Sequence, residues 1–340
     1  MAPTERLNLK SYLFKLIIFF LIAFFSALIG LWAGPTKMNL EDVLSTLISS
    51  DTTKTFYQII WEIRLPRVLF ALAVGGGLSI AGAVFQAILM NPLAEPYILG
   101  ISSGGTFGAV LSFVIGASFV GTQFFSFLGA LIVMILVFVL GKRFGELEPN
   151  ILLLTGVMIG AFFSAAILLM MTLLNDSLRT AVFWLIGNLS IAPKENLVFV
   201  LPVTLIVSFI LTINSNKYNL LSLGTDTAKQ LGVNTAAIKN VTYILTSIMI
   251  GTLVSVSGII GFVGLLIPHV CRSIFGIDNR VVLPASFFIG AAYLTLADTL
   301  ARTLVAPSEL PVGAITALIG APIFIYLLKQ KFNFQTEQGD

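Results

Sequence analysis

Uninterrupted apolar stretches recur along almost the whole chain, and they limit its fold more than any other feature. Stretches of about 17–25 residues are long enough for an α-helix to cross a hydrocarbon layer of about 30 Å. Charged residues make up 10% of the chain and apolar residues 57%, whereas a soluble domain has about 25% charged residues. A β-barrel would instead show alternating segments of about ten residues. The sequence therefore predicts an all-α, polytopic membrane protein.

We expect about ten transmembrane helices. They are expected at residues 13–32, 65–89, 98–119, 124–140, 151–174, 197–213, 241–257, 259–275, 282–301 and 312–328. The first stretch follows basic residues, as in a secretory signal peptide, but its apolar part is too long and lacks a clear cleavage site. We interpret it as a retained helix, and we expect the whole chain, 1–340, to form one membrane domain around the bundle 13–328.

An even number of spans places both termini on the same side of the membrane, and basic residues indicate which side. With both termini in the cytoplasm, twelve of the 19 Lys and Arg residues lie inside and seven outside. The inner set is Arg6, Lys10, Lys15, Lys142, Arg143, Lys217, Lys229, Lys239, Arg272, Arg280, Lys329 and Lys331. The outer set is Lys37, Lys54, Arg64, Arg67, Arg179, Lys194 and Arg302. This bias favours cytoplasmic ends at 1–12 and 329–340, and it explains the net charge of +3 without a nucleic-acid partner.

Two connections between spans are expected to contain short helices. Residues 176–190 are amphipathic but too short to span, which predicts a helix lying at the outer interface with Trp184 as its anchor. Residues 214–240 hold the longest polar stretch inside the chain, on the cytoplasmic side. Between Gly224 and Gly232 we expect a short helix with Thr225 as its N-cap.

Glycine and serine are dense in two of the expected spans, at Gly75-Gly-Gly77, at Gly82 and from Gly100 to Gly108. One interpretation is close helix packing through small residues. The other is a pathway lined by helices whose backbones approach each other or break. The two interpretations are compatible, and the residues alone leave both open.

Several classes of chemistry lack their motifs in this sequence. The chain has no Gly-x-x-x-x-Gly-Lys-Ser/Thr phosphate loop, no His-Glu-x-x-His zinc site and no Gly-x-Ser-x-Gly nucleophile turn. Its single histidine, His269, and single cysteine, Cys271, exclude a multi-histidine metal cluster and an internal disulfide. We therefore expect no enzyme activity, no resident metal and no cofactor. A transported metal would have to arrive inside a chelator.

Asp298 is the one carboxylate that we place inside a span, four residues before Arg302. A carrier coupled to ions or protons would need several buried carboxylates. We therefore expect these two residues to form an ion pair on the helix surface, with a lone proton relay as the alternative.

A series of short motifs extends over residues 64–328. They are Arg64-Leu-Pro-Arg67, Gly82 to Pro96, Leu99 to Gly104, Leu152 to Gly156, Trp184 to Gly187, Leu223-Gly224 with Leu231 to Val233, Gly261 to Arg272, Ala297 to Arg302, Glu309 to Gly313 and Gly320 to Phe324. In this order and spacing they resemble the permease subunit of ABC importers for iron-siderophores, haem and vitamin B12, the FecCD-type family. The resemblance implies ten helices per subunit and pairing with a second permease subunit, either another copy or a homologous chain.

The resemblance also implies two cytoplasmic ATPase subunits, an extracytoplasmic substrate-binding protein and a multi-pass location in the cytoplasmic (inner) membrane of a bacterium, in contact with membrane lipid. Such a chain would translocate a ferric siderophore inward by ATP-driven alternating access. A haem or cobalamin importer is the alternative within the family. A self-contained secondary transporter is the alternative from another class.

The resemblance assigns an outer docking site and an inner gate. Docking of the binding protein is expected at Arg64, Arg67 and Arg302, because arginine can hold a carboxylate by two hydrogen bonds. Anchoring of these arginines in lipid headgroups is the alternative. The gate residues expected at the cytoplasmic end are Asn91, Pro92, Leu93, Glu95 and Pro96, with Asn150 opposite. The two prolines would make this segment a stiff elbow.

The third group of residues assigned by the resemblance lies in the cytoplasmic segment. The surface that seats in the ATPase is expected to consist of Leu223, Gly224, Ala228, Leu231, Gly232 and Val233. An ordinary solvated loop is the alternative.

Overall fold

The computed structural model describes residues 9–48, 55–143, 145–174, 178–190 and 192–337. The expectations for Arg6, for Lys54, for the start of the 176–190 helix and for the outermost residues of both chain ends therefore lie outside the described residues. Within these ranges the chain is helical except for the connecting loops and one β-hairpin, whose strands have two residues each. The predicted all-α membrane fold is confirmed.

The helices and strands follow one another in a fixed order. The first half contains α1 (Leu9–Trp32), α2 (Leu40–Ile48), α3 (Thr55–Tyr57), a π-helix (Gln58–Arg64), α4 (Leu65–Ile88), α5 (Ile101–Val114), α6 (Phe119–Leu140), β1 (Lys142–Arg143), β2 (Glu146–Leu147) and α7 (Pro149–Met171). The second half contains α8 (Leu178–Leu185), a 3₁₀ turn (Lys194–Asn196), α9 (Leu197–Ile213), α10 (Ser215–Leu221), α11 (Thr225–Gln230), α12 (Thr235–Ser257), α13 (Val263–Phe275), α14 (Asn279–Thr303) and α15 (Val312–Glu337). The strands β1 and β2 pair antiparallel, with Lys142 opposite Leu147.

Each of the ten expected spans corresponds to an apolar helix. In the part of the chain that the structure describes, seven helices are long and apolar enough to cross a membrane, and α5, α13 and the apolar part of α15 are shorter. The number of full crossings stays a prediction. At about 1.5 Å per residue, the 14 residues of α5 and the 13 of α13 extend about 20 Å, so each of these two helices crosses only part of a hydrocarbon layer.

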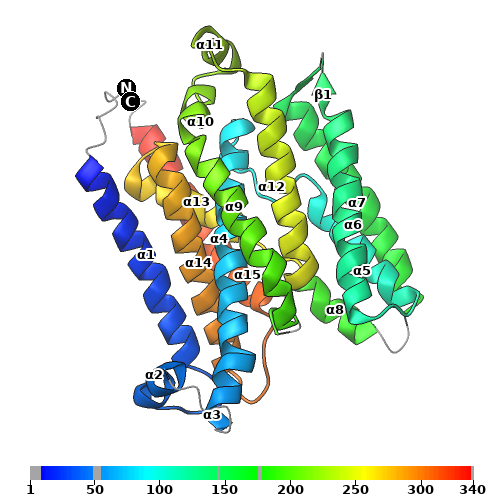
Figure 1. The fold of residues 1–340 in the computed structure, drawn as a ribbon. Helices are drawn as coiled ribbons and strands as arrows, with labels where there is room; N and C mark the ends of the chain where they lie inside the picture. Colours follow the sequence, from blue (N-terminus) through cyan, green and yellow to red (C-terminus); the bar gives the residue numbers. More distant parts are fainter. Residues whose placement is uncertain (1–8, 49–54, 144, 175–177, 191, 338–340) are drawn as a thin grey trace.

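The bundle has two distinct ends (Figure 1). At the upper end lie the beginning of α1, the end of α15, the short helix α11 and the β1–β2 hairpin; at the lower end lie α2 and α3. We call these the upper and lower ends below. The first helix thus begins, and the last helix ends, on the side that carries the polar segment 214–240; the cytoplasmic location of both termini stays a prediction.

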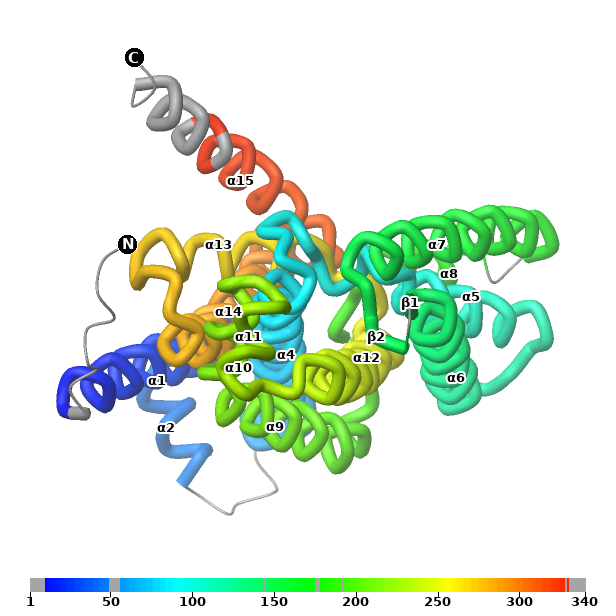
Figure 2. The backbone as a smooth tube through the Cα atoms, turned by 90° about the horizontal axis from the view of Figure 1, so that it is seen from above, coloured from blue at the N-terminus to red at the C-terminus, as the bar shows by residue number. Residues whose placement is uncertain are grey.

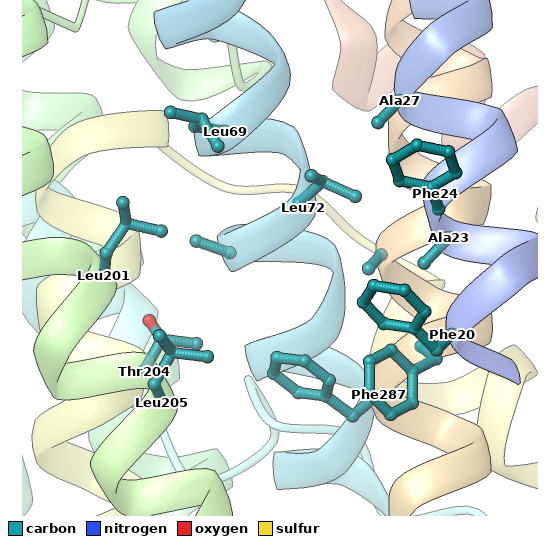
Figure 3. Close-up of a pocket in the computed structure, with 13 residues that line it drawn as sticks. Phe20, Ala23, Phe24, Ala27, Leu69, Leu72, Leu201, Thr204, Leu205 and Phe287 are labelled. Atoms are coloured by element: carbon teal, nitrogen blue, oxygen red, sulfur yellow. The ribbon is translucent and has the colours of Figure 1, made fainter. Parts of the chain in front are cut away.

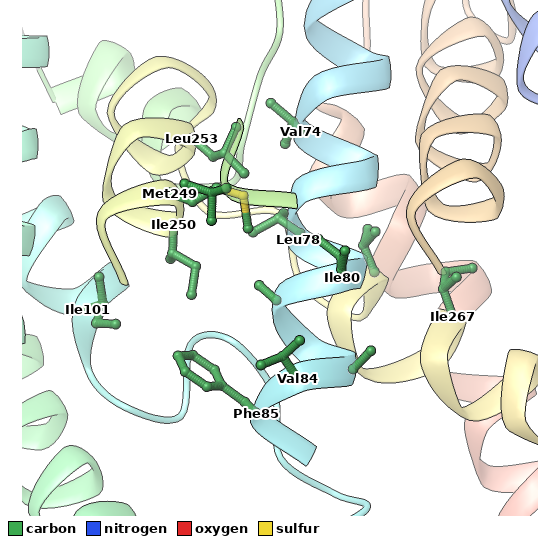
Figure 4. Packing of buried hydrophobic residues seen from close by; sticks show 14 of the residues in the cluster. Val74, Leu78, Ile80, Val84, Phe85, Ile101, Met249, Ile250, Leu253 and Ile267 are labelled. Carbon is green, nitrogen blue, oxygen red and sulfur yellow. The ribbon is translucent and has the colours of Figure 1, made fainter. Parts of the chain in front are cut away.

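The helix α4 occupies the centre of the bundle. Seen from above, it is surrounded by α9, α12, α13 and α14 (Figure 2), and almost all of its residues are buried. Figure 4 shows Val84 and Phe85 of α4 facing the same core as Ile250 of α12 and Ile101 of α5. Because α4 is covered on all sides, its sequence is apolar all round rather than along one stripe.

Glycines allow α4 to approach its neighbours at backbone distance. A Cβ added at Gly75 would overlap the carbonyl oxygen of Gly290 on α14, and one added at Gly82 would overlap that of Gly264 on α13. In a membrane the hydrophobic effect does not drive helices together, because lipid is as apolar as the helices. Small residues at the crossings let the helices pack closely, and this packing holds them together instead. The packing interpretation of the glycine-rich spans is confirmed at these positions.

The helix that contains the expected span 65–89 is longer than predicted. Together with the π-helix it runs from Gln58 to Ile88 without a break. The π turns end just before Pro66, which has no backbone N–H to donate. The helical turns before residue 65 were not predicted, because Glu62 and Arg64 interrupt the apolar pattern of the sequence.

The expected interfacial anchor at Trp184 is wrong. The helix α8 forms as predicted between two spans, but Trp184 is only 2% exposed and belongs to the main hydrophobic core. The reason is a close backbone contact: Gly258 has a positive φ of 67°, and a Cβ there would overlap the carbonyl oxygen of Trp184. This contact holds the Trp184 side of α8 against the end of α12, while Leu178, Arg179, Thr180, Val182 and Phe183 of the same helix stay exposed.

Candidate functional site

Three groups of residues were expected to carry function, and the structure places them in three separate regions. The lower cluster consists of Arg64, Arg67, Asp298, Arg302 and Glu309. The gate segment is residues 91–97, between α4 and α5. The coupling segment is residues 214–240, at the upper end.

Arg67 is the centre of the lower cluster. Its Nε and Nη2 donate to Asp298, at 3.0–3.1 Å, and its Nη1 donates to Glu309 Oε2 at 2.8 Å. Arg302 Nε lies 3.2 Å from Asp298 Oδ2. Asp298 is therefore shared by two guanidinium groups, and it joins α4 to α14.

The ion pair expected between Asp298 and Arg302 is present, but the expectation that it lies on the helix surface is wrong. The side chain of Asp298 is only 1% exposed. Its second partner, Arg67, comes from a helix far away in the sequence, which no local pattern could reveal. A buried charge of this kind is stable only when it is paired and hydrogen-bonded, and here the pairing is bidentate.

Arg64 serves a different partner set. It donates to the backbone carbonyl oxygens of Leu31 and Trp32 at 2.7 Å and of Thr36 at 2.6 Å. The carbonyls of Leu31 and Trp32 lie in the last turn of α1, where a helix leaves its carbonyl groups without partners in the helix, and Thr36 lies in the loop that follows. Arg64 thus caps α1 and fixes it to the helix that leads into α4.

All three arginines of the expected docking site are buried within the chain, at 2–6% exposed. The alternative role in lipid headgroups is wrong, because a guanidinium buried in protein does not reach the headgroup layer. The docking role stays a prediction. In this conformation a partner can approach the cluster at Glu309, which lies at the exposed edge of Arg67.

The gate segment leaves α4 in a tight turn. Asn91 Oδ1 accepts a hydrogen bond from the Leu93 N–H at 2.9 Å, and the Asn91 carbonyl oxygen accepts one from the Ala94 N–H at 3.1 Å. Pro92 and Leu93 are exposed at the tip of the turn, whereas Pro96 is buried. The expected stiff elbow is therefore present as a structure, and its role as a gate stays a prediction.

Gln86 and Arg272 hold the gate segment against α13. Gln86 Nε2 donates to the carbonyl oxygen of Ala94 at 3.3 Å, and Gln86 Oε1 accepts from Arg272 Nη1. Arg272 Nη2 also donates to the carbonyl oxygen of Ala83 at 3.0 Å. The end of α13 is thereby tied to the last turn of α4. Sequence reasoning placed Arg272 only as an orientation signal and did not single out Gln86.

Asn150, expected to oppose the gate segment, is exposed in the first turn of α7. The two residues before Asn150 start the helix. Glu148 is the N-cap and accepts a hydrogen bond from the Ile151 N–H at 2.7 Å, and Pro149 occupies the first helical position. A small cavity is lined by both Pro149 and Leu89, which places the start of α7 beside the end of α4. The gate role of Asn150 stays a prediction.

The coupling segment forms two short helices, α10 and α11, instead of one solvated loop. Gly224, with φ of 107°, is the N-cap of α11, so Thr225 is the first helical residue and not the cap. Gly232 ends α11 with φ of 83°, and the Val233 N–H bonds the Ala228 carbonyl oxygen at 3.0 Å. This is the Schellman type of helix ending, for which glycine is preferred.

The tip of the coupling segment exposes apolar side chains. Leu223 and Leu231, on either side of α11, are 53% and 56% exposed, while Ala228 between them is fully buried. Gly232 is exposed, and Gly224 and Val233 are half-buried. Leu223 and Leu231 thus expose apolar surface at the two ends of this short helix, which a partner can cover. We call these two side chains the apolar knob.

Polar contacts fix the coupling segment to the rest of the bundle. Asn219 Nδ2 donates to Asp278 Oδ1 at 2.7 Å, and Asn219 Oδ1 accepts from the Asn279 N–H at 2.8 Å. Burial alone would raise the pKa of Asp278, but hydrogen bonds from Arg280 and Asn219 outweigh it, so the pKa is lowered. A charged Asp278 therefore connects α10 to the start of α14.

An apolar groove lies elsewhere, between helices of the bundle (Figure 3). It has a volume of about 240 Å³ and is formed by α1, α4, α9 and α14, with Phe20, Phe24 and Phe287 around it. Thr204 is its one polar lining residue. Such a groove offers nothing to a charged chelate. In the described part of the chain, no group of three or more His, Cys, Asp or Glu side chains could hold a metal ion.

The comparisons with known proteins fit this arrangement of helices. The model of the FecCD transport family matches residues 19–330. The chain belongs to this family. A solved structure described as an inward-facing conformation of a putative metal-chelate type ABC transporter superimposes with a TM-score of 0.83 at 35% identity, covering 93% of this chain and 98% of that one.

Curated relatives agree. The chain is 42% identical to the uncharacterized ABC transporter permease protein YvrB of Bacillus subtilis, covering 80% of this chain and 79% of the relative. It is 35% identical to the Fe(3+)-citrate import system permease protein YfmE of the same species, covering 97% and 98%. This protein is thus the multi-pass permease component of an ABC importer. Members of the family are membrane permeases and not the ATPase subunits of such importers.

Cargo differs among the relatives. Proteins that are 35–38% identical to this chain are named for the import of molybdate, cobalamin, ferric citrate and hemin. Family membership therefore does not select the cargo of this chain.

Proposed function

We propose that this permease carries a ferric siderophore into the cell by ATP-driven alternating access. The match to the FecCD family over residues 19–330 carries the proposal. Within the described residues, no acidic, histidine or cysteine cluster is suited to a bare metal ion, so the metal has to travel inside a chelate that satisfies its coordination. Haem or cobalamin is the second candidate, because relatives of similar identity are named for those cargoes.

The proposed assembly contains this chain as one membrane domain, a second permease subunit, two cytoplasmic ATPase subunits and an extracytoplasmic binding protein in the cytoplasmic membrane of a bacterium. The exposed knob of Leu223 and Leu231 supports a cytoplasmic partner at the upper end, since two leucines presented together leave apolar surface in water. The whole surface proposed to seat in the ATPase is Leu223, Gly224, Ala228, Leu231, Gly232 and Val233. The lower cluster would then face the binding protein, with Arg67 approached beside Glu309.

The gate is proposed at Asn91, Pro92, Leu93, Glu95 and Pro96, opposed by Asn150. The exposed turn at Pro92 and Leu93 sits at the end of α4, beside the start of α7. This neighbourhood supports a constriction between the two helices. A self-contained secondary transporter does not fit membership in an ABC permease family.

Growth of a deletion strain under iron limitation tests the cargo. The strain is supplied with single chelates: a hydroxamate siderophore, a catecholate siderophore, ferric citrate, haem or, in a cobalamin-requiring background, cobalamin. We expect the chain to restore growth on at least one ferric siderophore. Restoration on haem or cobalamin alone would move the assignment to the second candidate.

A further inference from the structure

Two helix interruptions meet inside the bundle. One is the gate segment, which precedes the short helix α5. The other is residues 258–262, which separate α12 from α13. Because α5 and α13 each extend only about 20 Å, each leaves part of a hydrocarbon layer of about 30 Å to be crossed by non-helical backbone. Backbone that is not helical at this depth must find its hydrogen-bond partners inside the protein.

Two residues of the gate segment, Glu95 and Tyr97, supply such partners. Glu95 Oε1 accepts a hydrogen bond from the Phe262 N–H at 3.0 Å, and the Tyr97 hydroxyl oxygen accepts one from the Ile260 N–H at 3.1 Å. Between them, Pro96 packs directly on Gly264, where a Cβ would overlap its ring. We call Glu95, Pro96 and Tyr97 the clasp.

The clasp holds a strained junction. Phe262 has a positive φ of 68°, which is uncommon for a bulky residue. It precedes α13, so its N–H points out of the helix start, where the helix dipole favours a carboxylate. Glu95 satisfies that N–H from another part of the chain, and so the beginning of α13 depends on the position of the gate segment.

The other end of α13 leads toward the coupling segment. Arg272, in the last turn of α13, bonds Gln86 and Ala83 of α4. Three and four residues beyond the end of α13, Asp278 and Asn279 bond Asn219 of α10. The helix α13 and the three residues after it therefore connect the clasp to the residues that bond the coupling segment.

Resting on the proposed function, we propose that Glu95 and Tyr97 are positioning residues that make the gate segment and the start of α13 move as one body when the coupling segment is displaced. The hydrogen bonds act through their acceptors, so the role requires an oxygen at each position and not a negative charge. Glu95→Gln keeps a carbonyl acceptor, whereas Glu95→Ala and Tyr97→Phe remove one. Tyr97→Phe keeps the ring and therefore changes the packing least.

Hydrogen–deuterium exchange on the purified full-length chain tests the clasp without requiring transport. We expect Tyr97→Phe and Glu95→Ala to speed exchange in the peptide covering 258–264 by about threefold to tenfold, as for the loss of one hydrogen bond, and Glu95→Gln to leave it unchanged. Tyr293→Phe is the matched control, because it removes a tyrosine hydroxyl that bonds the Thr316 carbonyl oxygen at 3.2 Å outside the clasp. Exchange in 258–264 equal to that of the unaltered chain in both acceptor-free variants would overturn the clasp.

Transport by the assembled importer tests its consequence. In proteoliposomes with the ATPase and binding protein, we expect Tyr97→Phe and Glu95→Ala to lower the cargo moved per ATP hydrolysed at least fivefold while the ATPase rate stays within about twofold. Glu95→Gln and Tyr293→Phe should keep the ratio. An unchanged ratio in the acceptor-free variants contradicts the inference. If the unaltered complex moves no chelate at all, the proposed function fails, whereas the exchange result still decides the clasp.

Discussion

The two ends of this molecule treat their functional residues in opposite ways. At the lower end, three arginines and Asp298 are buried and bonded to one another or to backbone carbonyls. At the upper end, Leu223 and Leu231 are exposed on either side of a six-residue helix. The lower cluster stabilises the fold even without a partner, while the coupling segment presents surface that only a partner would bury. The two sets of residues that the resemblance assigns to partner proteins thus differ in accessibility: the arginines are buried, and the leucines are exposed.

The largest expected effect comes from breaking the lower cluster. Asp298→Ala would leave Arg67 and Arg302 buried without their shared partner, and we expect a loss of about 3–5 kcal/mol of stability, measured as a lower Tm and yield in detergent. The control is Glu62→Ala, which removes an exposed ion pair with Lys194. Such surface pairs contribute about 0–1 kcal/mol. A Tm for Asp298→Ala equal to the control would show that the cluster does not stabilise the fold.

At the upper end the expected effect is on binding and not on stability. Leu231→Asp removes half of the apolar knob, and because burying a leucine contributes about 1.5–3 kcal/mol, we expect association with the ATPase to weaken by about one to two orders of magnitude. Co-purification and titration with the ATPase measure this, with an unchanged Tm for the chain. Leu40→Asp, equally exposed but at the lower end, should bind as the unaltered chain does. Equal weakening in both variants would count against the coupling surface.

A smaller effect is expected inside the upper end. Asn219→Ala removes the hydrogen bonds to Asp278 and Asn279, at about 1 kcal/mol each. The ATPase should still bind, because the leucine knob is intact, but transport per ATP should fall. Assays in proteoliposomes measure both quantities. The link between α10 and α14 would be irrelevant to transport if only the binding affinity changed.

The smallest effect is expected for Glu309→Gln in the lower cluster. The amide still accepts from Arg67, and the exposed carboxylate contributes little to stability, so we expect a change below about 1 kcal/mol in the free energy of unfolding. If a partner approaches Arg67 at this position, affinity for the binding protein should change more than stability does. Surface plasmon resonance compares this variant with Glu62→Gln. Identical affinities would move the docking surface away from Glu309.

The sequence was sufficient for the helical membrane fold because apolar length alone determines it. Each expected span has its helix, but several ends differ by five residues or more from the expected ones. The helix α5 ends at Val114 instead of 119, α6 begins at Phe119 instead of 124, α12 begins at Thr235 instead of 241, and α15 ends at Glu337 instead of 328. The start of α13 moved from 259 to Val263 because Gly258 and Phe262 adopt positive φ. The start of α5 moved to Ile101 because the gate segment turns back to bond the same junction.

The candidate sites were less predictable, since their chemistry depends on contacts across the chain. Nothing near Asp298 in the sequence indicates that Arg67 will share it. Tryptophan is a residue type typical of interfacial anchors, yet Trp184 lies in the core because its backbone contacts Gly258 at the end of α12. The coupling helix was located correctly from Gly224 and Gly232, because glycines at helix ends act locally.

Uptake of a radiolabelled ferric siderophore into proteoliposomes tests the central claim most directly. We compare the chain alone, the chain with its ATPase and binding protein, and the full complex carrying Leu231→Asp. Accumulation is expected only in the full complex with ATP, and it should drop sharply in the variant. Uphill accumulation by the chain alone would contradict the account, because it would show that this permease needs no force applied at its exposed upper end.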